Sequence, residues 1–83
     1  MNKHHRLTLS RIFAAPVPAG LRWADIEALF LALGAAVSEG AGSRVRVELN
    51  GVRAVFHRPD TRQAAVRSVR DFLTAAGISP TKE

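Results

Sequence analysis

The 83-residue chain contains no cysteine, no tyrosine and only one tryptophan. Without cysteine it can form no disulfide and no thiolate metal site, which fits a reducing compartment. It has no run of eighteen apolar residues, and residues 1–6 are polar and basic where a signal peptide needs an apolar stretch. We therefore expect one small cytoplasmic domain with no membrane segment, because 47% apolar residues suffice for a single modest core.

Acidic residues are scarce beside the basic ones, with 7 Asp and Glu against 12 Lys and Arg, for a net charge of +5. The excess of positive charge lies in residues 42–70, which contain seven arginines, no lysine and two acidic residues. Because a guanidinium binds phosphate through a planar two-pronged fork, an arginine-only segment favours a polyanionic partner, above all RNA. The alternative is a basic solvated surface without a partner.

The first twenty residues are interpreted as an appended arm. Residues 8–14 are a short helix candidate, and Pro16, Pro18 and Gly20 then interrupt any helix and indicate a linker. This divides the chain into an N-terminal arm, residues 1–20, and a single domain, residues 21–83.

The clearest pattern in the sequence is a β-hairpin. Polar and apolar residues alternate over 43–49, Asn50-Gly51 is the preferred pair for a type I′ turn, and residues 52–57 form the returning strand. A two-residue turn fixes the register, so Arg44 is predicted to lie opposite His57. One face then carries apolar side chains for the core, and the other carries Arg44, Arg46, Glu48, Arg53, Val55 and His57.

The segments on either side of the hairpin complete the fold prediction. Apolar residues at helical spacing indicate a helix over 23–33, and residues 35–39 form a short strand. After Pro59, a helix capped by Asp60 or Thr61 is predicted to run to Ala76. The fold class is therefore α+β in the order α-β-β-β-α: a three-stranded antiparallel sheet with both helices on its apolar face.

Few residues offer catalytic chemistry. No carboxylate pair has promising spacing, and His4 and His5 in the arm leave His57 without a second ligand, so no metal site and no cofactor are expected. His57 could move a proton during RNA cleavage, or it could be an ordinary residue at a strand end. Trp23 fits core packing better than base stacking, which favours contact with RNA shape and phosphates.

Short motifs along the chain resemble a known family. Trp23–Glu27, Leu33-Gly34, Gly42-Ser43 at a strand start, and Phe72–Gly77 at the end of a basic helix are similar to HicA toxins of bacterial toxin–antitoxin pairs, over residues 22–78. The resemblance implies a fold like that of double-stranded-RNA-binding domains and a metal-independent endoribonuclease that cleaves mRNA. It also implies a HicB-like antitoxin as protein partner.

The resemblance also directs attention to the start of the hairpin. In HicA toxins the catalytic histidine follows the Gly-Ser pair, whereas here Arg44 follows Gly42-Ser43. We hypothesise that His57, opposite Arg44, takes the place of that histidine. The alternatives are a non-catalytic RNA-binding module and a docking domain for an acidic protein. The candidate RNA contacts are Ser43, Arg44, Arg46, Arg53 and Arg58.

Overall fold

The computed structural model describes residues 2–80, and its elements follow the predicted α-β-β-β-α order, preceded by a helix in the N-terminal segment. No helix in this part of the chain is long and apolar enough to cross a membrane. The elements are α1 (Lys3–Ile12), α2 (Trp23–Ala32), β1 (Ala36–Glu39), β2 (Arg44–Leu49), β3 (Val52–His57) and α3 (Gln63–Ala75).

The three strands form one antiparallel sheet in the order β1-β2-β3. The hairpin register is the predicted one, running from Leu49 opposite Val52 to Arg44 opposite His57. Asn50 and Gly51 both have positive φ angles, 51° and 82°, as a type I′ turn requires. The prediction of the hairpin is therefore confirmed down to individual residue pairs.

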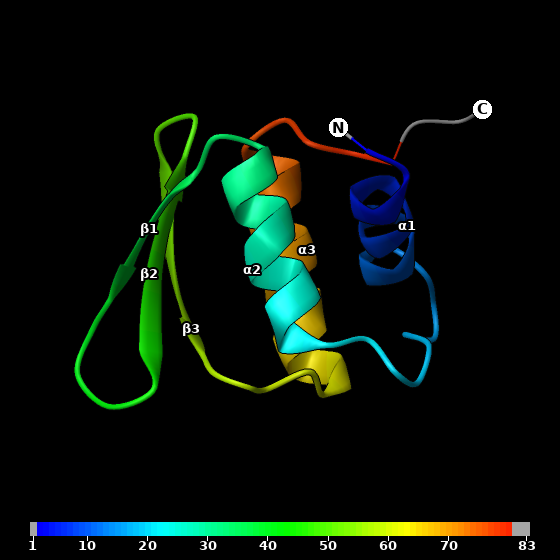
Figure 1. Cartoon of the computed structure of the whole chain (residues 1–83), viewed down its shortest axis with the longest axis horizontal. Helices are drawn as coiled ribbons and strands as arrows, with labels where there is room; N and C mark the ends of the chain where they lie inside the picture. The colour runs from blue at the N-terminus through cyan, green and yellow to red at the C-terminus, as the bar shows by residue number, and fades with distance from the viewer. Residues whose placement is uncertain (1, 81–83) are drawn as a thin grey trace.

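The elements form three layers, with the sheet on one side, α2 and α3 packed side by side against it, and α1 beyond them (Figure 1). The central contact is among Phe30 of α2, Phe56 of β3 and Phe72 of α3, whose ring centroids lie 5.7–5.8 Å apart in each pair. The predicted placement of both helices on one face is confirmed, and the opposite face of the sheet is open.

Both helices that cover the sheet end in the same hydrogen-bonded motif. Gly34 and Gly77 have φ angles of 87° and 83°, and the next amide bonds back to a carbonyl five residues earlier, at Phe30 and Leu73. The start of α3 differs from the prediction. It begins at Gln63, because the carboxylate of Asp60 accepts the backbone N–H of Arg62 and forms a turn in place of a helix cap.

The N-terminal helix also differs from the prediction over residues 8–14. It spans Lys3–Ile12, because the side chain of Asn2 accepts the N–H of His5 and caps the helix. Leu9 and Ile12 are buried in the same core cluster as the aromatic residues. Arg70 of α3 donates to the carbonyls of Ile12 and Ala14 at 3.1 and 3.0 Å. The segment interpreted as an appended arm thus contributes to the domain core.

The hairpin turn is attached to the end of α3. The side-chain N–H of Asn50 donates to the carbonyl of Ala76 at 2.8 Å. A carbonyl that has no hydrogen-bond partner within the helix is therefore paired with the turn. This contact fixes one end of the sheet against the helix layer.

Substitution of Ile12 tests how far α1 belongs to the core. Ile12 is fully buried, so Ile12→Ala is expected to lower the free energy of unfolding by about 2–5 kcal/mol. Leu7 lies on the same helix but is 47% exposed, so Leu7→Ala serves as the control and should cost far less. Urea denaturation of both variants measures the difference. Equal small effects would show that α1 is a detachable arm.

Substitution of Asn50 tests the link between turn and helix. Asn50→Gly keeps a residue that tolerates positive φ but removes the donor to Ala76, and we expect a loss of about 1 kcal/mol in unfolding free energy. Asn50→Asp should cost more, because a carboxylate would face a carbonyl oxygen at the negative end of a helix. Thermal denaturation compares the three proteins. An Asn50→Gly variant as stable as the wild type would contradict the link.

Candidate nucleic-acid interface

The open face of the sheet is organised in rows across the strands. Register places Ser38 beside Arg46 and Arg46 beside Val55 in the middle row. The row nearer the Asn50-Gly51 turn holds Ala36, Glu48 and Arg53, and the row at the other end pairs Arg44 with His57. All of these side chains are exposed.

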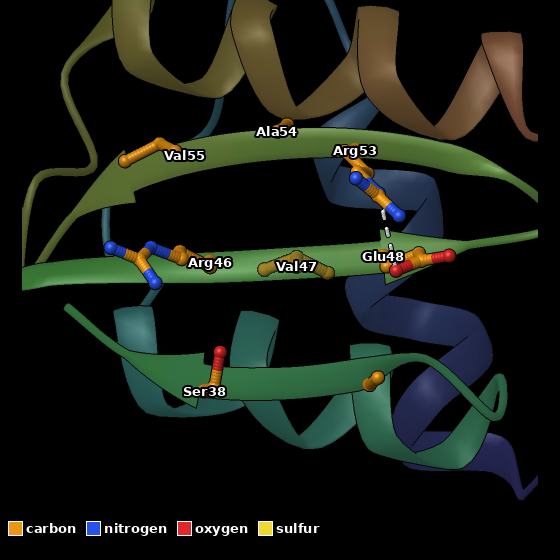
Figure 2. A pocket seen from close by; sticks show the side chains of 8 residues that line it. Ser38, Arg46, Val47, Glu48, Arg53, Ala54 and Val55 are labelled. Carbon is orange, nitrogen blue, oxygen red and sulfur yellow. Dashed lines mark ion pairs between the residues drawn. The ribbon is translucent and has the colours of Figure 1, made fainter.

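A shallow hollow of about 380 Å³ occupies the middle of this face, and Figure 2 shows the residues around it. Arg46 and Arg53 stand at its rim, while Val55 is 57% exposed beside it. Arg53 forms an ion pair with Glu48 at 3.3 Å, but its side chain is 82% exposed and both partners are open to solvent. Such a pair is weak and can be exchanged for a phosphate. The face therefore offers arginines around an apolar floor.

Arg44 and His57 form the last pair of the hairpin, as predicted. The N–H of Arg58 donates to the carbonyl of Ser43 at 2.9 Å, so the next pair outward is a hydrogen-bonded one. Because antiparallel pairs alternate, Arg44 and His57 form a non-hydrogen-bonded pair, whose side chains approach to about 4.5–5.5 Å at Cβ. A guanidinium and an imidazole thus project side by side from the open face.

Arg58, one of the candidate RNA contacts, is engaged elsewhere. It follows His57, so strand alternation directs its side chain away from the open face toward α2. There it donates twice to Glu27, at 2.8 and 2.7 Å, and once to Glu39 at 2.6 Å. The hydrogen bonds that Arg58 donates to these carboxylates raise its pKa above the ordinary value. Arg58 is therefore a clamp that joins β3, β1 and α2.

The sequence pattern does not predict this clamp, because it groups Arg58 with the other arginines of residues 42–70. The alternation of side chains was the signal that could have separated it from Arg46 and Arg53. Its partners could not be identified in that way, because Glu27 and Glu39 lie 31 and 19 residues earlier in the chain. Ser43, another candidate contact, is exposed, and its backbone carbonyl supports Arg58.

The loop after β3 contains the nearest carboxylate to His57 in sequence, that of Asp60. Arg62 binds this carboxylate with two side-chain hydrogen bonds, at 3.0 and 2.8 Å, and with its backbone N–H. These bonds lower the pKa of Asp60 to about 2. Asp60 is therefore ionised at neutral pH and cannot donate a proton there. Of these two side chains, His57 is the one that could take part in proton transfer.

The other two histidines lie on α1. His4 is 3.2 Å from the carboxylate of Asp25 on α2, so it belongs to the contact between two helices. Across residues 2–80, no three histidine or carboxylate side chains gather in a way that could hold a metal ion. His57 is thus the histidine that lies beside the exposed arginines of the open face.

Comparison of the chain with protein-family models, with curated proteins and with solved structures finds no match.

Substitutions of single arginines distinguish the structural role of Arg58 from the proposed RNA contact of Arg46. Arg46 makes no side-chain hydrogen bond within residues 2–80, so Arg46→Gln should leave the melting temperature nearly unchanged and reduce the salt slope of RNA binding by up to about one unit. Arg58→Gln should lower the melting temperature by several degrees, because Glu27 loses its partner, and should leave the salt slope unchanged. Fluorescence polarisation at several salt concentrations and thermal denaturation measure both. A reduced slope for Arg58→Gln would place Arg58 on the RNA.

Proposed function

We propose that the protein is a HicA-like RNA-binding domain whose open sheet face holds the phosphates of an RNA strand. The observation that supports this most strongly is the sorting of charge between the two faces. Arg44, Arg46 and Arg53 are exposed on the open face, where Glu48 is the one acidic residue among residues 2–80. Glu39 alternates to the other side and binds Arg58.

The spacing of the three arginines suits a chain of phosphates. Arg44 and Arg46 point to the same face two residues apart, which is about 6.8 Å along a strand. Arg53 lies one row further along, on the neighbouring strand. The three guanidinium groups therefore form an oblique line across the sheet, along which a flexible RNA backbone can present successive phosphates.

His57 gives this surface a route to metal-free cleavage. In this step the imidazole removes the proton of a ribose 2′-hydroxyl, whose oxygen then bonds to the adjacent phosphorus as the bond to the 5′-oxygen breaks. Arg44, beside His57, donates hydrogen bonds to the phosphate oxygens that gain charge. Water supplies a proton to the leaving 5′-oxygen, and the products are a 2′,3′-cyclic phosphate and a 5′-hydroxyl.

A non-catalytic RNA-binding role is the second candidate, and one observation favours it. Among residues 2–80, no second group suited to proton transfer accompanies His57, because Asp60 is bound by Arg62 and Arg44 stays protonated at neutral pH. Such a module would hold RNA through the same arginines without cutting it. In either role an acidic protein such as a HicB-like antitoxin would compete with RNA for this face.

A cleavage assay in the presence of EDTA tests the catalytic proposal. The wild-type protein should cut single-stranded RNA to products with cyclic phosphate ends, and His57→Ala should reduce the rate by about 10²–10⁴-fold while RNA affinity changes little. Arg46→Gln is the matched control on the same face, and its main effect should be weaker binding. Intact RNA that is bound but never cut would support the non-catalytic role. Failure to bind RNA at near-physiological salt would contradict both.

A further inference from the structure

A second hollow, of about 240 Å³, lies between the free edge of β3 and the first two turns of α3. His57 stands at its rim, and its walls are largely apolar or small. Because β3 is the last strand of the sheet, no neighbouring strand fills this space. The lining residues are Trp23, Val55, Phe56, His57, Asp60, Ala64, Ala65 and Ser68.

Polar groups of the backbone face this hollow from β3. Val55 pairs with Arg46, and counting outward from the turn makes this a non-hydrogen-bonded pair, like that of Arg44 and His57. The N–H and C=O of Val55 therefore point away from β2, toward the free edge. One donor and one acceptor at neighbouring positions match the hydrogen-bonding edge of a nucleobase.

Trp23 forms part of the wall of the same hollow. Its side chain is 6% exposed, and its indole N–H is buried without a hydrogen-bond partner in the described structure. The hollow thus combines apolar walls with the outward-facing backbone groups of Val55, and small-molecule sites likewise combine apolar walls with a few polar groups.

We propose that this hollow is a subsite for an unpaired nucleobase of the RNA. The inference rests on the proposed function and deepens it. His57 lies between Arg44 and the hollow, so a nucleotide with its phosphate on Arg44 has its ribose over His57 and its base at the edge of β3. The order of phosphate, ribose and base along a nucleotide is the order of these three features across the sheet.

The volume of the hollow indicates what kind of ligand it can hold. Pockets for drug-sized ligands hold roughly 300–1,000 Å³, so a space of about 240 Å³ suits a single planar ring system better than a base pair. The substrate class is therefore RNA with unpaired bases. Recognition here does not use an exposed aromatic platform, because Trp23 and Phe56 are both 6% exposed and contribute ring edges to the wall.

The single tryptophan provides a direct readout. Binding of a single-stranded RNA hexamer should change the emission of Trp23 saturably, and an abasic hexamer with the same phosphates should bind with a similar salt slope but leave the emission unchanged. Loss of the hydrogen bonds between the base and Val55 should weaken binding by roughly two- to tenfold, which is the net contribution of a typical hydrogen bond. Equal affinity and equal emission changes for the two hexamers would overturn the subsite.

A larger side chain in the hollow provides an independent test of the subsite. Ala64 is exposed at the start of α3, so Ala64→Leu should fold normally, by circular dichroism, and should bind the normal hexamer about as weakly as the wild type binds the abasic one. Ala75→Leu is the matched control, because Ala75 is exposed three turns further along the same side of α3. Unchanged affinity of Ala64→Leu for the normal hexamer would also overturn the subsite.

The failure of the subsite is distinguishable from the failure of the proposed function. If only the subsite is wrong, both hexamers bind equally and Arg46→Gln still reduces the salt slope. If the proposed function is wrong, neither hexamer binds and the arginine substitution has no effect. Saturable binding of an extended peptide that RNA cannot displace would assign the β3 edge to a protein strand and would overturn the nucleobase subsite.

Discussion

The two-residue turn at Asn50-Gly51 is the constraint on which the rest of the structure depends. Its positive φ angles force a tight hairpin, and the hairpin permits one register. That register gives β2 and β3 an apolar face and an arginine-bearing face, because a slip of one residue would exchange the two. It also places Arg44 opposite His57. The proposed phosphate binding and proton transfer on this surface depend on that pairing.

The helix layer determines which face of the sheet is left open. Phe30 and Phe72 pack on Phe56, so burial of aromatic surface holds α2 and α3 on one side. The Arg58 clamp then fixes the end of the hairpin that carries His57, through carboxylates on α2 and β1. Arginine thus has two separate uses here: Arg58 supports the fold beneath the sheet, and Arg44, Arg46 and Arg53 are exposed on its open face.

Local sequence predicts the parts of this fold that depend on near neighbours. The hairpin could be predicted because its alternation and its turn lie within 15 residues, and α2 because its apolar spacing is regular. The burial of Leu9 and Ile12 could not be predicted in this way, because it depends on a distant helix and on the cap at Asn2. The partners of Arg58 and the hollow beside β3 were hidden for the same reason: they exist only after distant segments have packed together.

The most direct test of the central claim is chemical-shift mapping by NMR of the isotope-labelled protein titrated with single-stranded RNA. If the open sheet face holds the phosphates, the largest shifts will fall on Arg44, Arg46 and Arg53 and on the His57 ring, while amides of α1 stay unperturbed. Shifts concentrated on α1, with β2 and β3 unchanged, would contradict the account and place the RNA on the opposite side of the molecule.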